Sequence, residues 1–406
     1  MKRRLLKISL ILILLVIYFY TCAITSIPQN IVIIEGEKLN LKMATGLSLI
    51  SKNQDTVLTA SNINKQKISE AGVEKLKLSL FGDIKIKDVN VAVVPKTTVI
   101  PLGTAIGMKL YTKGVLVVGM SQIKDENNEK KKPYENSGIE QGDTILAINN
   151  NEVSNTDELI KEVNNSNGNE IKIKYAKNNE TLETSIKPVK SNNEYKLGLW
   201  VRDAAAGVGT LTFYEPSTNT FMALGHGISD IDTEKIVDIS SGELITANIL
   251  SIKKGVKGTP GEIRGTIENG YNIGTINKNT SLGVYGSVTN KNYLDTSGYG
   301  EMEVATRSEI QDGKAQIICQ LDNSGKKTYE IKIYLANNTD NKSMLIKVTD
   351  KELLEKTGGI IQGMSGAPVI QNGKFIGAVT NVLVNDPTQG YAIFADMMIK
   401  QIRSVD

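Results

Sequence analysis

Histidine and cysteine are nearly absent from this chain of 406 residues, which contains one histidine, His226, and two cysteines, Cys22 and Cys319. A mechanism that needs two imidazoles is therefore excluded, as is a histidine-rich zinc site, and we expect neither a metal nor a cofactor. An excess of one charge is also lacking, because 47 Lys and Arg residues stand against 44 Asp and Glu, without a long basic block. That balance argues against nucleic acid as a partner.

Aromatic residues are scarce, at 5%, whereas glycine is frequent, with 36 residues, and many β-branched residues stand among Asn, Gly and Ser. Short strands joined by turns suit this composition better than helical bundles do. The length allows two or three domains. We therefore predict a mainly β protein with several domains.

A long apolar run occupies residues 8–24, directly after a basic N-terminus. At about 1.5 Å per residue, a helix over this run spans roughly 26 Å, slightly less than the hydrocarbon core of a bilayer. The basic flank stays in the cytoplasm, which places everything after residue 28 across the membrane. A cleaved signal peptide is the alternative, although no clean small-residue cleavage motif follows. We predict an uncleaved anchor in residues 1–27, which contains Cys22 and leaves only Cys319 in the exported part.

Three exported segments follow, at residues 28–99, 100–190 and 195–406. The first has short β-branched runs between Gly and Asn turns, which indicates a small β-rich domain. The stretch from Ser26 through Pro28 is expected to be an accessible linker between this domain and the anchor.

The second segment combines a short apolar strand at 114–119, a polar loop, a Gly142-Asp143 turn, a strand at 145–148 and a helix that Thr156 opens. This pattern resembles a PDZ domain. The alternative is that the glycines only make turns in another kind of β-domain.

The PDZ resemblance implies peptide capture by β-augmentation, in which an extended peptide adds a strand to a sheet edge and backbone amides hold its carboxylate. On this resemblance residues 104–110 would be the carboxylate-binding loop, with Ile106, Gly107 and Met108 as candidate peptide-binding residues.

The third segment carries Asn-Gly or Asp-Gly pairs at 269–270, 312–313 and 372–373, each between apolar runs, which is typical of tight hairpins. Several hairpins in this length fit a closed or double barrel. Residues 395–402 have apolar residues at helical spacing and predict a terminal helix packed on the barrel.

Ser365 lies in the sharpest motif of the chain, Gly-Met-Ser-Gly-Ala-Pro over residues 363–368. A serine hydroxyl needs a base to take its proton and donors to stabilise the oxyanion. The flanking glycines allow the Gly363 and Ser365 amides to point into one oxyanion hole. The motif resembles the nucleophile loop of chymotrypsin-like serine peptidases; the alternative is an ordinary turn.

The base has one candidate, His226, which lies between glycines at the end of an apolar run and far upstream of the serine, as in two-barrel peptidases. The orienting acid is open on sequence grounds. Asp230 and Asp232 are close to the histidine in sequence, Asp295 lies midway, and Asp350 lies shortly before the serine.

The whole arrangement, with Leu-Gly-His-Gly-Ile-Ser-Asp at 224–230 and Thr-Gly-Gly-Ile-Ile-Gln-Gly-Met-Ser-Gly-Ala-Pro at 357–368, closely resembles the stage IV sporulation signalling serine peptidases of endospore-forming bacteria. The resemblance implies a catalytic His226, Ser365 and Asp350. It departs from the chymotrypsin pattern because Asp350 is so near the serine.

The resemblance further implies export from the forespore into the space between its two membranes, and cleavage of a regulator anchored in the outer forespore membrane. That cleavage would activate an intramembrane protease and then a late mother-cell sigma factor. Self-cleavage near the N-terminus is implied as well, making the N-terminal region a second substrate and releasing a soluble form.

Two other functions compete with this one. The first is a PDZ-bearing signalling adaptor whose peptidase domain is vestigial, which the intact serine motif and the histidine disfavour. The second is an envelope quality-control serine protease, in which the PDZ domain follows the peptidase rather than preceding it.

Overall fold

The computed structural model describes residues 2–35, 39, 41, 43–51, 57–63, 72–178, 180–335 and 343–403. The chain divides into two compact units, Met1–Thr97 with Glu303–Ile310, and Thr98–Met302 with Gln311–Asp406. Strands form the body of both units, so the mainly β prediction is confirmed.

The first unit begins with the helix α1 and continues as a five-stranded sheet in the order β1-β5-β4-β2-β3, in which β1 runs parallel to β5. Residues 7–25 of α1 are long and apolar enough to cross a membrane, a test that a signal sequence also passes. The elements are α1 (Lys2–Thr25), β1 (Asn30–Ile34), β2 (Leu47–Ser51), β3 (Val57–Thr59), β4 (Gly72–Leu80) and β5 (Ile84–Val94), with the short 3-10 helix η2 (Arg307–Glu309) from the later segment.

The end of α1 is attached directly to this sheet. Ile27 is only 1% exposed and belongs to the core of the unit, with Ala23 and Ile24 packed against it. The Lys87 ammonium donates a hydrogen bond of 3.1 Å to the Ile24 carbonyl, near the helix C-terminus, where a cation is favoured. In the stretch expected to be an accessible linker, Ser26 and Pro28 are exposed, whereas Ile27 between them is buried in the core.

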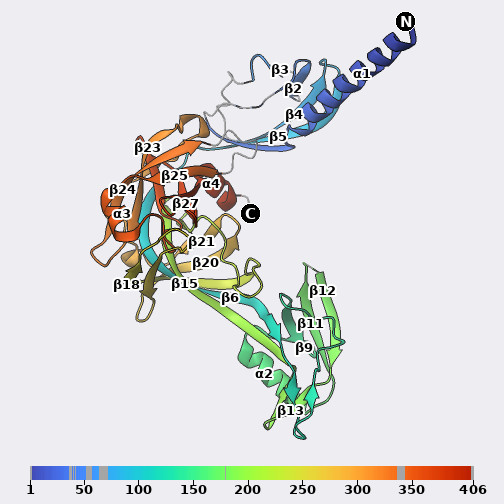
Figure 1. Ribbon diagram of the computed structural model, residues 1–406, viewed down its shortest axis with the longest axis vertical. Helices are drawn as coiled ribbons and strands as arrows, with labels where there is room; N and C mark the ends of the chain where they lie inside the picture. Colours follow the sequence, from blue (N-terminus) through green and yellow to red (C-terminus); the bar gives the residue numbers. More distant parts are fainter. Residues whose placement is uncertain are drawn as a thin grey trace. The chain divides into compact units, whose positions relative to one another are not determined.

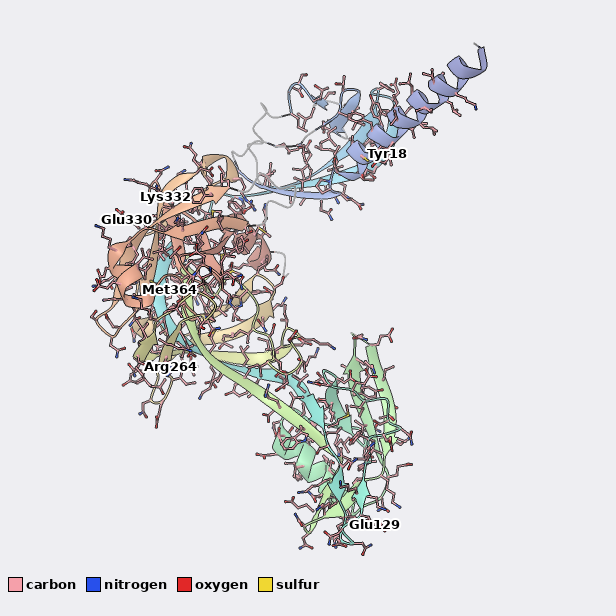
Figure 2. The ribbon with its side chains drawn as sticks, in the orientation of Figure 1. Tyr18, Glu129, Arg264, Glu330, Lys332 and Met364 are labelled. Carbon is pink, nitrogen blue, oxygen red and sulfur yellow. The ribbon has the colours of Figure 1, made fainter. Side chains whose placement is uncertain are left out.

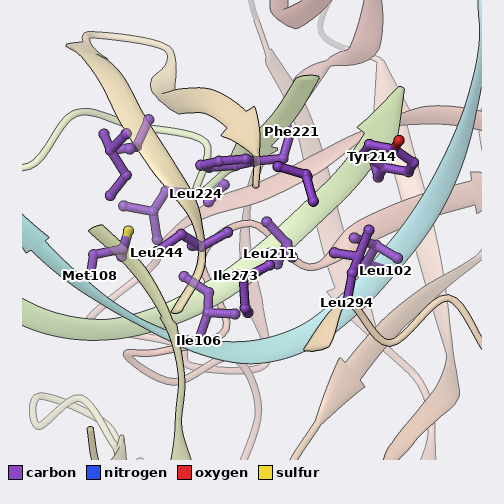
Figure 3. Packing of buried hydrophobic residues seen from close by; sticks show 14 of the residues in the cluster. Leu102, Ile106, Met108, Leu211, Tyr214, Phe221, Leu224, Leu244, Ile273 and Leu294 are labelled. Carbon is purple, nitrogen blue, oxygen red and sulfur yellow. The ribbon is translucent and has the colours of Figure 1, made fainter. Parts of the chain in front are cut away.

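Six strands of the second unit close into a first barrel in the order β6-β15-β16-β21-β20-β17, with β17 pairing back onto β6. Apolar side chains from all six strands fill it, and Figure 3 shows Ile106 and Met108 of β6 in the same cluster as Leu244 and Phe221. The strands are β6 (Thr98–Met120), β15 (Leu199–Glu215), β16 (Thr220–Ala223), β17 (Ile239–Thr246), β20 (Asn272–Thr280) and β21 (Gly283–Val288); β18 (Asn248–Lys253) pairs with β19 (Glu262–Thr266), and η1 (Lys291–Tyr293) and β22 (Met302–Glu303) follow.

The expected PDZ segment is inserted into this barrel. Strands β6 and β15 run side by side out of the barrel and into a smaller domain, where Leu116–Met120 still pairs with Leu199–Arg202 (Figure 1). Gly114, at φ +95°, lies where the strands leave the barrel. The inserted elements are β7 (Ile123–Lys124), β8 (Lys130–Lys131), β9 (Thr144–Ile148), β10 (Asn151–Glu152), α2 (Thr156–Asn165), β11 (Ile171–Lys177), β12 (Glu180–Ile186), β13 (Val189–Ser191) and β14 (Glu194–Lys196).

A second barrel is closed in the order β23-β24-β25-β28-β27-β26. Of the three expected hairpins only the turn at Asn372-Gly373 joins two paired strands, and both of its residues have positive φ. The expected terminal helix is present as α4. The elements are β23 (Gly313–Gln320), β24 (Lys326–Leu335), β25 (Ser343–Val348), α3 (Lys351–Thr357), β26 (Pro368–Gln371), β27 (Lys374–Val382), β28 (Gln389–Phe394) and α4 (Ala395–Arg403).

The structure corrects the expected carboxylate-binding loop and the boundary at residue 100. Ile106, Gly107 and Met108 lie in the middle of β6, which pairs with β15 on one edge and with β17 on the other. No backbone edge is left there for a peptide to join, and the side chains of Ile106 and Met108 are in the barrel core. Residues 104–112 therefore form part of the first barrel.

We expect Gly107→Ala to destabilise the barrel rather than to alter peptide capture. A Cβ at this position would lie 1.9 Å from Cγ2 of Ile267, and overpacking of this kind costs about 1–3 kcal/mol. Denaturant unfolding would measure the loss. Gly300→Ala, where a Cβ meets nothing within 4 Å, is the matched control; equal stability of the two variants would contradict the packing argument.

Candidate active site

His226 and Ser365 line the same cavity, of about 540 Å³, although they come from different barrels. His226 follows β16 of the first barrel, and Ser365 precedes β26 of the second. Both side chains are half-buried. The structure thus brings together the two residues that the sequence singled out, with Gly363 also in the lining.

The Ser365 loop is shaped by glycines on both sides of the serine. Gly363 has φ +97° and Gly366 has φ +96°, a region that favours glycine. Met364 is buried and anchors the loop in the protein body (Figure 2). Within the described residues, the backbone N–H groups of Gly363 and Ser365 have no hydrogen-bond acceptor. Two such donors at one loop can stabilise an oxyanion.

The hydroxyl of Ser365 donates a hydrogen bond of 2.6 Å to the backbone carbonyl of Thr380 in β27. It makes no hydrogen bond to His226 in this conformation of the described chain. A serine bonded to a carbonyl keeps its proton, because a carbonyl oxygen cannot act as a base of useful strength. The hydroxyl must therefore rotate away from Thr380 before it can react.

The imidazole of His226 is oriented by the main chain. Its Nδ1 lies 2.8 Å from the Gly227 carbonyl, and because a carbonyl only accepts, Nδ1 carries the proton. Nε2 is then left with a lone pair, the form that a general base needs. The next residue, Ile228, is held by Asn279 of β20, which accepts from its N–H at 2.8 Å and donates to its carbonyl at 2.7 Å.

Thr210 of β15 connects the loops of the histidine and the serine. Its hydroxyl donates to the Gly363 carbonyl at 2.7 Å and its N–H to the Ser365 carbonyl at 3.3 Å. Its own carbonyl accepts from the N–H of Leu224, two residues before His226, at 3.1 Å. One buried residue thereby sets the position of both loops.

The two loops also meet by direct contact. A Cβ on Gly366 would lie 2.4 Å from the Thr210 carbonyl oxygen and 2.6 Å from the Leu224 nitrogen. Leu224 itself has φ +62°, a strained conformation for a residue with a branched side chain. Glycine at 366 is therefore required for this approach of backbone to backbone.

Asp350 is placed differently from what the family resemblance implies. It is the N-cap of α3, where its carboxylate accepts from the Leu353 N–H at 3.0 Å and from the Glu330 N–H at 3.3 Å. It does not line the cavity of His226 and Ser365. The helix that it caps ends at Gly358 and leads into the Ser365 loop, so Asp350 supports the loop rather than the imidazole.

The other candidate acids are also engaged elsewhere. Asp230 and Asp232 both form ion pairs with Arg202. Asp295 accepts from the N–H of Ser297 and lies 3.5 Å from the Lys326 ammonium. None of the three lines the cavity.

Thr210, Thr380 and Asn279 were not singled out from the sequence. Threonine and asparagine in strands carry no catalytic signature, and their roles depend on strand pairings between distant segments. In the part of the chain that is described, no group of three or more His, Cys, Asp or Glu residues could hold a metal ion.

A serine and a histidine that meet between two six-stranded barrels define the class of two-barrel serine peptidases. The profile of the family described as SpoIVB peptidase S55 matches residues 193–399, half of the chain, and the chain belongs to that family of serine peptidases. A PDZ profile matches residues 106–187. The expected PDZ-containing serine peptidase is thus confirmed.

The individual proteins that this chain resembles have low sequence identity to it. A putative zinc metalloprotease of Lactococcus lactis is 25% identical over 103 residues, which are 25% of this chain and 23% of that protein. The chain thus matches about a quarter of that curated relative.

Two kinds of solved structure are similar in part. The PDZ domain of an SdrC-like protein from Listeria monocytogenes is 22% identical and covers 22% of this chain and 87% of that domain, with a TM-score of 0.18. The Rv3671c protease in an inactive form is 13% identical and covers 49% of this chain and 84% of that one, with a TM-score of 0.27. A mutant of the same protein from M. tuberculosis has a TM-score of 0.26 at 12% identity, covering 49% of this chain and 81% of that one.

We expect Asp350→Asn to keep activity within about tenfold, because asparagine also caps helices well. Asp350→Ala should lose about 1 kcal/mol of stability and lower the melting temperature by roughly 2–4 °C. Steady-state kinetics on a peptide substrate and thermal unfolding would measure both variants. A triad acid would instead show a loss of about 10⁴-fold for asparagine at unchanged stability.

Proposed function

We propose that this protein is an endopeptidase that uses Ser365 as nucleophile and His226 as general base. The observation that carries the proposal is the cavity where the serine and the lone imidazole meet, beside the N–H groups of Gly363 and Ser365, which have no acceptor among the described residues. An intact loop of this kind favours a working enzyme over a vestigial domain.

The geometry supports the following course of reaction. The Ser365 hydroxyl turns from the Thr380 carbonyl to Nε2 of His226, which takes its proton as Oγ attacks the scissile carbonyl carbon. The oxyanion accepts from the Gly363 and Ser365 N–H groups. The imidazolium, held through Nδ1–H by the Gly227 carbonyl, then gives the proton to the leaving amine. Water hydrolyses the acyl-enzyme by the same steps in reverse.

The substrate and the setting are inferred from the family. We infer that the enzyme acts during endospore formation on a regulator anchored in the outer forespore membrane, and that this cleavage activates an intramembrane protease and a late sigma factor. The apolar helix supports tethering or export at the forespore membrane. An envelope quality-control protease has less support, because the family matched is that of the SpoIVB peptidases.

The PDZ domain is proposed to capture an extended peptide C-terminus at the start of β15. Leu199–Arg202 pairs with β6 on one edge only, and α2 runs near the other edge. Just before this segment, the N–H groups of Leu197 and Gly198 have no acceptor among the described residues. Free amides before an open strand edge are what a peptide carboxylate needs.

Ser365→Ala and His226→Ala should each reduce peptide hydrolysis by several orders of magnitude while the fold is retained. Labelling by a fluorophosphonate probe should be lost in Ser365→Ala and slowed strongly in His226→Ala, since no other imidazole is present. Ser251→Ala, at an exposed strand position, is the control. Activity of Ser365→Ala within about tenfold of wild type would remove the nucleophile assignment.

Self-cleavage should shorten the wild-type protein at a site between residue 27 and residue 100, whereas Ser365→Ala stays full length. N-terminal sequencing of the products, with each variant expressed alone, would locate the cut. If both forms shorten equally, another protease trims the chain.

A further inference from the structure

Arg202 joins the inserted PDZ domain to the segment that follows the catalytic histidine. It lies in the part of β15 that pairs with β6 inside the PDZ domain. Its guanidinium forks between two carboxylates, with Nη1 on Asp230 and Nη2 on Asp232 at 2.7 Å. Asp230 is only four residues beyond His226, so one side chain of the PDZ domain reaches the neighbourhood of the base.

The segment that Arg202 holds is a small hairpin over residues 228–237, which we name the Asp230 hairpin. Ser229 bridges Ile236, and the Val237 N–H donates to the Ile228 carbonyl at 3.0 Å. Its first residue, Ile228, follows Gly227, whose carbonyl orients the imidazole. A shift of the hairpin therefore moves the peptide group that fixes His226.

The hairpin is held at both ends. At its base Asn279 of the barrel binds Ile228 and donates to the Val237 carbonyl at 3.0 Å, and Ile228 packs against the barrel core. At its tip the contacts are with the PDZ domain: Gln141 donates to the Asp232 carbonyl at 2.8 Å, and the Lys235 side chain lies over Gly142. Among these contacts at the tip, Arg202 forms the ion pairs with the hairpin.

Asp230 needs this partner because its side chain is only 2% exposed. Burial pulls the pKa of Asp230 upward, but the Thr233 N–H, the Arg202 guanidinium and the Asp232 N–H outweigh it and leave the pKa below its usual value. The carboxylate is thus charged and satisfied. Removal of Arg202 would leave a buried charge with backbone donors alone, which strongly favours opening of the hairpin.

We propose that Arg202 is a positioning residue for His226, acting through Asp230, so that catalysis depends on the seating of the PDZ domain. The inference rests on the proposed function, since it presumes that His226 is the general base. The inference goes beyond the proposed function because it makes Arg202, a side chain of the PDZ domain, responsible for the position of His226. A displacement of about 1 Å in a catalytic group can lower the rate by about 100-fold.

The test is the kinetics of Arg202→Gln in the full chain on a short peptide substrate, too short to engage the PDZ domain. We expect kcat per active site, titrated with a fluorophosphonate, to fall at least about tenfold, with KM within about twofold of wild type. The kcat of Asp230→Asn should fall by a similar factor. The double variant should be no worse than either single variant, because both break one interaction. Arg202→Lys should be intermediate, since a lysine cannot reach both carboxylates in a fork.

Lys190→Gln is the matched control, because Lys190 forms an exposed ion pair of 2.9 Å with Glu126 in the same domain, away from the hairpin. It should behave as wild type. A kcat of Arg202→Gln within about twofold of wild type, with Ser365→Ala inactive, would overturn the inference and leave the proposed function standing. Should Arg202→Gln fail to fold, the double variant decides, since it buries no unpaired charge; a wild-type kcat there overturns the proposal as well.

Discussion

The active site depends on one buried threonine in a strand of the first barrel. Thr210 uses all three of its polar groups on the two loops, the hydroxyl and N–H on the serine loop and the carbonyl on the histidine loop. The approach also requires Gly366 to have no side chain and Leu224 to adopt a positive φ. Such strain is sustained only where the surroundings fix the backbone. Contacts between the two loops, rather than a contact between the serine and histidine side chains, therefore fix the positions of both residues before substrate binds.

The orientation of the base is likewise set by the main chain. In the chymotrypsin arrangement a carboxylate accepts from the histidine Nδ1–H, whereas here the neighbouring Gly227 carbonyl does so. A carbonyl fixes the tautomer but offers a developing imidazolium less stabilisation than a full negative charge. The acidic residues near the site serve instead as supports: Asp350 caps α3 before the serine loop, and Asp230 ties down the hairpin after the histidine.

Sequence reasoning located the features that local chemistry determines. The serine motif, the Asn372-Gly373 turn, α2 and α4 each follow from a few adjacent residues. It failed where distant pairing decides: residues 104–110 suggested a binding loop, but they lie within β6, because β15 and β17 pair along this segment. Asp350 carried a readable signal, since an Asp before an apolar helical pattern that ends in Gly358-Gly359 is a helix cap. The resemblance to a catalytic acid hid it.

The PDZ domain is joined to the first barrel by two strands, β6 and β15, because it is inserted between them. Tyr111 and Ala204 are direct pairing partners at the edge of the barrel. The chain therefore enters and leaves the inserted domain at neighbouring positions. Without the insertion, a short turn could join β6 to β15 there. The barrel therefore keeps its register. The same two strands then continue as the PDZ sheet, and the Thr112 hydroxyl donates to the Asp203 carbonyl at 3.1 Å where they bend at Gly114. The pairing of β6 with β15 is interrupted at this bend, between the pair Arg202–Leu116 and the pair Ala204–Tyr111. On the barrel side of the interruption, Ala205–Gly209 of β15 line the cavity that contains His226 and Ser365.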